Sequence, residues 1–352
     1  MKPSKKCYAA IDLHSNNLFI AVVDSEGRRL AHARLFCELY EVDKFLRRRK
    51  ARIEAIAVES TFNWYWLVDG LRALGYNVVL ANPAGIVQYD GLKHADDRSD
   101  AFFLAELLRL GILPTGYVLE PKLRAVRDLL RRRASLVSKR TSLILSLRNM
   151  RMRIQGGSLS SNAIKAMPAI ELVALFADPA EKLVADVQKG HIDALGRSIR
   201  RIERHVLGTA LRLPNYAELA GVPGIGRILA MTIVLEIGDI RRFATAGDFA
   251  SYARTVKADR SSNGKSKGAN NRKCGNRHLA WAFVEAANFI RRYDERAERW
   301  HARKKRSTNA VVATKALACK LAKTVWHILS EGTHYDGDRL FGPAPAAKTT
   351  AA

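Results

Sequence analysis

Four carboxylates in the first hundred residues are spaced so that they could hold divalent metal ions. Asp12 and Glu59 each end an apolar run that is typical of a β-strand, whereas Asp97 and Asp100 lie three residues apart, on one face of a predicted helix. Converging carboxylates repel one another unless cations neutralise them. Two Mg²⁺ ions about 4 Å apart would do so, and would stabilise the attacking and leaving oxygens of a phosphoryl transfer. The pattern therefore predicts a two-magnesium site for phosphodiester chemistry.

Each of these carboxylates, taken alone, also has a purely structural explanation. An aspartate that ends a strand often forms a turn, and Asp97 could be the N-cap of its helix. Asp96 adjoins Asp97, so the register of this pair is open. As a set of four in a strongly basic chain, the carboxylates favour catalysis.

A polar loop around residue 262 offers hydroxyls and cations that suit close contact with a phosphodiester. Ser261 and Ser262 lie in a stretch too polar to be core, and His278 is the histidine nearest to them in the sequence. A serine nucleophile needs activation by a base, a metal or positive charge. Taken alone, such a loop is more typical of a flexible segment that binds nucleic-acid backbone. The candidate backbone-binding residues here are Arg260, Lys265, Lys267, Arg272 and Lys273.

The elements that carry the first four carboxylates have an order that indicates an α/β ribonuclease-H-like (RuvC-like) fold. Three short strands over 8–36 suggest an antiparallel meander, after which helices and strands alternate. The expected elements are a helix at 42–49, a strand at 53–59, a helix at 64–74, a strand at 77–81 and a helix at 98–110. In such a sheet the first and fourth strands are neighbours, so Asp12 and Glu59 would face one another.

The same opening also begins the actin-like ATPase fold, in which residues 12–16 would form a phosphate-binding hairpin. That fold normally has a glycine- and hydroxyl-rich loop at this place, and Asp-Leu-His-Ser-Asn is not such a loop. No later strand in the sequence is followed by a glycine-rich adenosine motif. The ribonuclease-H-like order is therefore favoured.

Residues 121–155 form a predicted basic helix, with eleven basic residues against one acidic residue. A glycine pair ends it, and a second long helix is expected at 179–211. Two long helices that flank a break suggest an antiparallel hairpin, or a coiled coil that pairs subunits. The residues of the first helix expected to bind nucleic-acid backbone are Arg131, Arg132, Arg133, Lys139, Arg140 and Arg148.

A glycine-rich turn at 221–226, before a helix predicted at 227–236, resembles a helix-hairpin-helix turn. Gly224 and Gly226 would let the backbone approach a phosphate at the helix N-terminus, although a tightly packed turn between helices would also use glycine. Residues 279–330 are expected to be helical. The sequence thus divides into a nuclease domain, a helical linker, a mostly α C-terminal domain and a disordered tail, at 1–118, 119–212, 213–335 and 336–352.

The composition points to a polyanionic partner. The chain has 352 residues, with 59 Lys and Arg against 34 Asp and Glu, a net charge of +25. At 48% hydrophobic residues it can build a core, so it is not a disordered basic protein. Four cysteines without a CxxC pair argue against a zinc ribbon or a disulfide framework and fit a reducing cytoplasm. Neither a signal peptide nor a membrane span of ~20 apolar residues is expected.

Several short motifs occur in a characteristic order between about residues 7 and 330. They are Ala-Ile-Asp12-Leu-His, Ala-Val-Glu59-Ser-Thr, Asp97-x-x-Asp100-Ala, Gly221-Val-Pro-Gly-Ile-Gly226, Glu236-Ile-Gly-Asp-Ile, Ser261-Ser-Asn-Gly and Lys273-Cys-Gly-Asn. This ordered set resembles the DEDD transposases of the insertion sequence 110 family. The chain departs from the family pattern at Lys257, where proline is frequent, at Asn263, where glycine is frequent, and at 93–96, where a lysine-threonine approach is usual.

The resemblance implies a RuvC-like nuclease domain, a coiled-coil linker and a C-terminal transposase domain, in a bacterial, nucleoid-associated recombinase that moves its own element. By that analogy Asp12, Glu59, Asp97 and Asp100 bind Mg²⁺, and Ser262 rather than Ser261 attacks the phosphodiester to form a covalent protein–DNA link. The family also implies a structured guide RNA, the bridge RNA, which pairs with target and donor DNA. Dimers would assemble into a synaptic tetramer whose sites combine domains of different subunits.

The sequence therefore predicts a transposase that cuts and rejoins DNA by magnesium-assisted serine attack. One alternative is a RuvC-like junction nuclease, which would use the same four carboxylates and a water molecule, without a covalent intermediate. A second alternative is a non-catalytic scaffold that binds RNA or DNA, whose activities would not depend on Mg²⁺.

Overall fold

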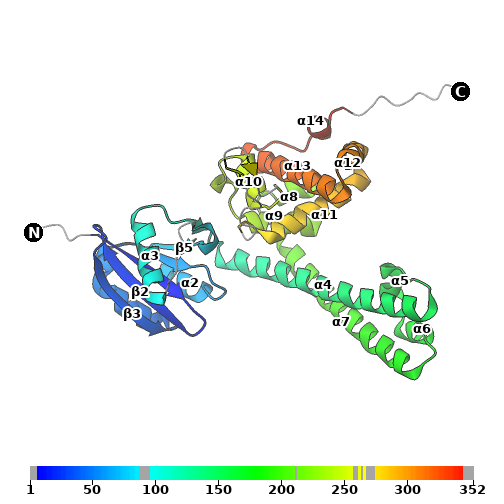
Figure 1. Cartoon of the computed structure of the whole chain (residues 1–352), viewed down its shortest axis with the longest axis horizontal. Coiled ribbons are helices and arrows are strands. Elements are labelled where there is room, and N and C mark those ends of the chain that lie inside the picture. Colours follow the sequence, from blue (N-terminus) through cyan, green and yellow to red (C-terminus); the bar gives the residue numbers. More distant parts are fainter. Residues whose placement is uncertain are drawn as a thin grey trace, which may run out of the picture. The chain divides into compact units, whose positions relative to one another are not determined.

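The chain forms two compact units in the computed structural model, Met1–Pro121 and Lys122–Ala352 (Figure 1). The structure describes residues 6–86, 96–210, 212–256, 261–262, 265–266 and 274–343. Across these ranges no helix is long and apolar enough to cross a membrane. The finer division into four parts stays a prediction.

The N-terminal unit is built on one mixed sheet with the strand order β3-β2-β1-β4-β5-β6. The first three strands form an antiparallel meander, β1 and β4 run parallel, as do β4 and β5, and β6 is antiparallel to β5. The strands are β1 Cys7–Leu13, β2 Asn17–Asp24, β3 Arg29–Phe36, β4 Ile53–Glu59, β5 Val78–Ala81 and β6 Thr115–Gly116. This topology is compatible with a ribonuclease-H-like domain and confirms the predicted order of the first five strands. The two-residue β6 was not predicted.

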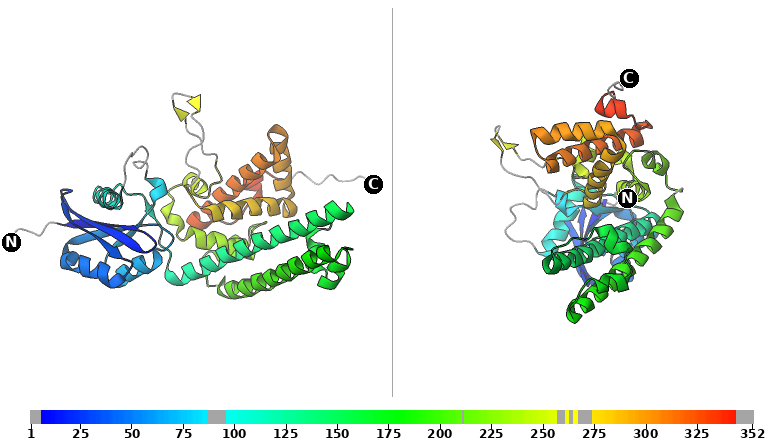
Figure 2. Two further views of the ribbon diagram at one scale, coloured as in Figure 1. Left: turned by 60° about the horizontal axis from the view of Figure 1, so that its bottom comes forward. Right: turned by 90° about the vertical axis from the view of Figure 1, so that its right-hand side faces the viewer.

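Helices cover both faces of this sheet (Figure 2). Helices α1 (Leu39–Leu46) and α2 (Tyr65–Ala73) pack on one face, whereas α3 (Asp97–Arg109) packs on the other. Because both faces are buried, β1 and β2 are almost continuously apolar instead of alternating. In β1 and β4 the charged side chains lie near the ends of the strands.

The helix expected at 42–49 is displaced toward the N-terminus. It begins at Leu39 and ends at Leu46, and residues Arg47–Arg52 continue as a 3-10 helix. Val42 and Leu46 are buried, one helical turn apart, and none of the residues of the 3-10 segment is buried. Packing against the sheet therefore ends where the apolar side chains end. A second 3-10 turn, Pro83–Gly85, follows β5.

Two long helices open the C-terminal unit and lie side by side (Figures 1 and 2). Helix α4 spans Pro121–Gln155 and α7 spans Pro179–Ala210, in agreement with the predicted bounds. Gly156, with a φ of 69°, ends α4. Two short helices that were not predicted, α5 (Ser161–Ala166) and α6 (Ala169–Ala174), close the far end of the pair with a small core.

The remaining elements form a mostly helical bundle around one large core, in which Phe249 and Phe283 are fully buried. They are α8 Tyr216–Ala220, α9 Arg227–Ile237, the 3-10 turn Ile240–Arg242, α10 Ala246–Tyr252, β7 Ser261–Ser262, β8 Lys265–Ser266, α11 Arg277–Tyr293, α12 Glu295–Ser307, α13 Ala310–Glu331 and α14 Gly337–Phe341. The prediction of a disordered tail from 336 was wrong for α14, whose N-cap Asp336 accepts hydrogen bonds from two of its backbone amides. Residues 344–352 lie outside the described part of the chain.

Candidate metal centre

Asp12 and Glu59 meet at the carboxyl ends of two parallel strands. The register pairs Ile11 of β1 with Val58 of β4, so the next residue of each strand stands at the same edge of the sheet. Asp12 is only 5% exposed. The parallel pairing thus places two carboxylates side by side, as the strand order predicted.

The start of α3 brings the other two carboxylates to this edge. Asp96 is the N-cap, because its carboxylate accepts a hydrogen bond from Ser99 N at 2.6 Å while Ser99 Oγ accepts one from Asp96 N at 2.9 Å. This capping box answers the open question of register. Asp97 is not needed as a cap, and it is free to face the strands together with Asp100.

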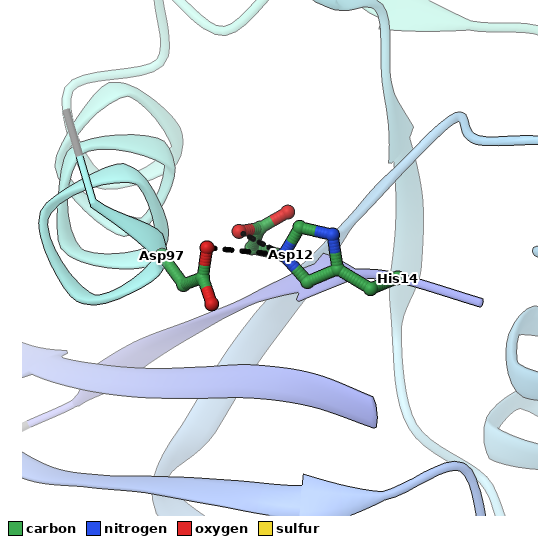
Figure 3. Close-up of side chains that lie close together, drawn as sticks. All are labelled: Asp12, His14 and Asp97. Atoms are coloured by element: carbon green, nitrogen blue, oxygen red, sulfur yellow. Dashed lines mark ion pairs between the residues drawn. The ribbon is translucent and has the colours of Figure 1, made fainter. Parts of the chain in front are cut away.

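His14 completes the cluster, and sequence analysis gave it no part in a metal site (Figure 3). Its Nε2 lies 3.2 Å from Oδ2 of Asp12 and 3.2 Å from Oδ1 of Asp97. Asn63 Nδ2 donates to the backbone oxygen of His14 at 2.8 Å. This hydrogen bond holds His14 against the segment that follows β4. The sequence signal that could have identified His14 is its spacing from Asp12, since residues two apart on an extended chain lie on the same side of it.

Arg34 of β3 is a further member of the cluster. Its Nη2 lies 2.5 Å from Oδ2 of Asp97, so the two oxygens of that carboxylate contact His14 and Arg34 respectively. His14 and Arg34 both come from the meander, and both contact Asp97 at the start of α3. They orient Asp97 toward Asp12.

The electrostatics of the cluster are those of crowded carboxylates. Burial, the hydrogen bond shared with Asp12, and the charges of Asp12 and Asp100 raise the pKa of Glu59 to about 8. Burial and the charges of Asp12, Asp96 and Asp97 also raise the pKa of Asp100. All four predicted carboxylates therefore interact in one place.

This donor set fits a divalent cation. One ligand atom each from Asp12, His14 and Asp97 lies within 4.8 Å of the others, and oxygen donors with one imidazole suit hard or borderline metals. A bound cation would favour the ionised form of Glu59 and Asp100, which burial and repulsion disfavour. The residues present can hold a metal and would be stabilised by one.

A pH dependence of stability follows from Glu59. Its pKa of about 8 in the folded chain exceeds the ordinary value of 4.5, so the stabilisation from its neutral form is present below pH 4.5 and is lost as the pH rises toward 8. We expect the unfolding midpoint of the metal-free protein to fall over this window, and a divalent cation to raise it more at pH 8 than at pH 5. Thermal unfolding of Glu59→Gln is the control: a slope as steep as in the wild type would contradict the assignment.

The structure describes only part of the serine region. Ser261 pairs with Ser266 and Ser262 pairs with Lys265 in the two-stranded β7–β8 sheet, seen as the yellow arrows in Figure 2. Only the backbone of these residues is described. The predicted backbone-binding residues Arg260, Lys267, Arg272 and Lys273 lie outside the described residues.

The predicted cations of α4 fall into two groups. Arg131 and Arg133 bind carboxylates within the unit, Glu236 and Glu203 respectively, and Arg131 does so through Nε and Nη2, each at 2.7 Å. Arg132 and Lys139 are exposed, Arg140 is half-buried, and Arg148 donates to Ser158 Oγ at 3.0 Å. Sequence periodicity does not distinguish an arginine that binds a buried glutamate from one that faces solvent.

Two of the three glycines of the 221–226 turn, Gly224 and Gly226, serve different purposes. Gly224 has a φ of 85°, and a Cβ there would lie 2.5 Å from the backbone nitrogen of Ile290. This glycine is required for close packing against α11, which was the alternative to phosphate binding. Gly226 is the N-cap of α9, with open space on its Cβ side.

Comparisons with known proteins agree with the motifs. A family model of the DEDD transposases of the IS110 type matches residues 9–152, and a model described as "Transposase IS116/IS110/IS902 family" matches residues 216–302. A probable family 20 transposase of Pseudomonas aeruginosa is 27% identical over 291 residues, which is 80% of this chain and 85% of that protein. The transposase of element IS1111A of Coxiella burnetii is 23% identical over 78% of this chain and 76% of its own length. The transposase of IS1533 of Leptospira borgpetersenii is 31% identical over 38% of this chain and 39% of its own.

Proposed function

This chain belongs to the IS116/IS110/IS902 family of transposases, and from that premise we propose that it is the recombinase of an insertion sequence, guided by an RNA that the element encodes. As a transposase it is an enzyme that cuts and rejoins DNA. The observation that carries the proposal is the meeting of Asp12, Glu59, Asp97 and Asp100 at one sheet edge, where burial and neighbouring charges raise the pKa of Glu59 and of Asp100. A cluster of this kind has no structural purpose of its own, because it destabilises the metal-free fold.

The cofactor of this site is proposed to be Mg²⁺, with two ions held by the four carboxylates. When bound, the ions polarise the scissile phosphate and stabilise its negative charge in the transition state. His14 and Arg34 orient Asp97, and the sheet edge keeps Asp12 and Glu59 adjacent. The oxygen-rich donor set supports a hard cation over a soft one.

The nucleophile is proposed to be Ser262 of β7. Its Oγ would form a bond to phosphorus as the bond between phosphorus and the leaving DNA oxygen breaks, and the serine proton would pass to that oxygen through solvent. The DNA strand would then be joined to the protein, and attack by the second strand would reverse the same step. The order of the motifs around Ser261-Ser262 and the hydroxyl- and cation-rich composition of the loop support this assignment.

A water-dependent junction nuclease is the second candidate. The carboxylate cluster lies entirely within the Met1–Pro121 unit, and such a cluster could activate water without a serine. This candidate predicts cleavage that leaves no protein attached to DNA.

Nucleic-acid binding is assigned to the exposed cations of α4, to Gly226 at the N-terminus of α9 and to the serine loop. The net charge of +25 supports a polyanionic partner, and Arg132 and Lys139 are exposed on α4. Sequence choice would come from pairing of the bridge RNA with target and donor DNA, as in other guided nucleases. The place of action is the bacterial nucleoid.

The proposed guide RNA is tested by sequencing the RNA that co-purifies with the protein. Purified from cells that contain the natural flanks of its gene, the protein should hold one discrete RNA encoded by the non-coding flank. Asp12→Asn should hold the same RNA, because base pairing does not need the carboxylate. A mixture of ribosomal and messenger fragments, identified by sequencing, would show only attraction of a basic protein to polyanions.

The active form is proposed to be a dimer that assembles into a tetramer, paired through a coiled coil of α4 and α7. Apolar side chains remain exposed on these helices: Leu145, Met152, Leu183, Val184 and Val187, between 42% and 63%. Exposed apolar residues one turn apart, such as Leu183 and Val187, are typical of a helix that packs on another copy.

This pairing predicts that the double substitution Leu183→Glu and Val187→Glu yields a monomer. The control is Lys182→Glu, which adds a negative charge at the adjacent exposed position. Sedimentation velocity over a range of concentrations measures both. Retention of the dimer by the double variant would place the interface elsewhere.

A further inference from the structure

A buried glutamate near the end of α9 has no part in the metal site. The side chain of Glu236 is only 2% exposed, although its neighbours in α9 from Leu229 to Ile237 are buried and, apart from Thr232, apolar. Arg131 of α4 donates to both of its oxygens at 2.7 Å, and Asn276 Nδ2 donates to Oε2 at 2.7 Å. Three strong hydrogen bonds thus join three elements that are distant in the sequence.

The glutamate stays ionised in this place. Burial acts to raise the pKa of Glu236, but the hydrogen bonds and charge of Arg131 and the hydrogen bond from Asn276 outweigh burial and lower it. A buried ion pair of this kind adds little net stability relative to well-packed apolar residues, while it fixes the relative orientation of its members. Its most direct effect is on the position of Asn276.

Asn276 fixes one end of the segment that carries the serine. Its Oδ1 caps α11 by accepting from His278 N at 2.8 Å, and its backbone nitrogen donates to Tyr252 O at 2.6 Å. The preceding Gly275 has a φ of 87°, and a Cβ there would lie 2.5 Å from the same Tyr252 oxygen. The chain at 274–276 is therefore held against the end of α10.

The other end of the segment is held at the same place. Arg254 Nε donates to Cys274 O at 2.9 Å, and Thr255 Oγ1 donates to Ala250 O at 2.8 Å, within the same turn that ends α10. The strands β7 (Ser261–Ser262) and β8 (Lys265–Ser266) lie between these fixed ends in the sequence, and the rest of 257–273 lies outside the described residues. Hydrogen bonds at the end of α10 therefore hold both ends of the segment that carries β7 and β8.

We propose that Glu236 and Arg131 are positioning residues for Ser262, acting through Asn276 on the base of the segment that carries β7 and β8. The inference rests on the proposed serine chemistry. An attacking oxygen must stand about 3 Å from phosphorus, and a displacement of 1 Å costs on the order of 10²-fold in rate. Since Arg131 belongs to α4, the same contacts tie the serine segment to the helix whose exposed cations are assigned to nucleic acid.

The test uses the full-length protein with its RNA and DNA substrates and compares two variants of equal charge. Glu236→Gln weakens the pair with Arg131, and Glu203→Gln weakens the pair that Arg133 of the same helix makes with α7. Two quantities are measured: the rate of covalent protein–DNA formation at saturating DNA, and the hydrogen–deuterium exchange of peptides that cover 274–279. DNA affinity and the unfolding midpoint are recorded for both.

For Glu236→Gln we expect the rate of adduct formation to fall by about 10²-fold at unchanged DNA affinity, and exchange at 274–279 to rise. Glu203→Gln should retain the wild-type rate and exchange. The double variant Glu236→Gln with Arg131→Gln should be no slower than the slower single variant, because the two residues act as one unit.

Two results would overturn the inference. One is a wild-type rate of adduct formation in Glu236→Gln. The other is unchanged hydrogen–deuterium exchange at 274–279 in Glu236→Gln. This exchange can be measured whether or not the protein uses a serine nucleophile. If the wild-type protein forms no adduct at all while exchange rises in Glu236→Gln alone, the serine mechanism fails and the anchoring of the segment stands.

Discussion

Asp12→Asn is expected to reduce strand exchange by about 10³-fold or more, since it removes a buried carboxylate of the proposed metal site, next to Glu59, His14 and Asp97. The change keeps the shape of the side chain, and Asn cannot bind a cation as strongly as a carboxylate. Exchange is measured as the yield of recombinant junctions from donor and target DNA with purified protein and RNA.

The stability of Asp12→Asn shows whether any loss of strand exchange is due to a loss of folding. The variant removes one of the charges that raise the pKa of Glu59, so the metal-free protein should be at least as stable as the wild type at pH 8. Asp96→Asn is the matched variant, because asparagine caps a helix about as well as aspartate and Asp96 serves as the N-cap. Exchange that survives in Asp12→Asn but is lost in Asp96→Asn would contradict the assignment of the site.

Ser262→Ala is expected to have an effect of similar or greater size, about 10⁴-fold on strand exchange, because removal of a covalent nucleophile leaves only binding and charge stabilisation. Binding of RNA and DNA should be unchanged. Ser261→Ala is the control, since its hydroxyl is one residue from the proposed nucleophile in the same strand β7. Normal exchange by Ser262→Ala, with Ser261 present, would exclude the assigned nucleophile.

The strand order of the N-terminal unit could be predicted because β1 and β2 are nearly continuous apolar runs, β3 alternates, and turns separate these three strands. β3 and β4 have the predicted bounds, Arg29–Phe36 and Ile53–Glu59. β6 has only two residues, too few for any periodicity, and it exists because Thr115 pairs with Ala81. The short helices α5 and α6 depend in the same way on tertiary packing, around Ile164 and Leu172.

The four carboxylates of the site could be found because each stands at a recognisable element end. Neither Arg34 nor the separate pair of Arg131 and Glu236 could be found in this way. Arg34 is 63 residues from Asp97 in the sequence, and Arg131 is 105 residues from Glu236, so neither pair leaves a local pattern. A run of arginines is typical of a solvated basic face, and only the buried carboxylate on another helix shows that half-buried Arg131 binds within the unit.

The measurement that tests the account most directly is covalent trapping on end-labelled DNA, resolved on a denaturing gel. Reactions contain the wild-type protein with RNA, with and without Mg²⁺, beside Asp12→Asn and Ser262→Ala. We expect labelled DNA to migrate with the protein only for the wild type with Mg²⁺. Magnesium-dependent cleavage without any attached protein, equally strong in Ser262→Ala, would contradict the serine mechanism and identify a nuclease that uses water.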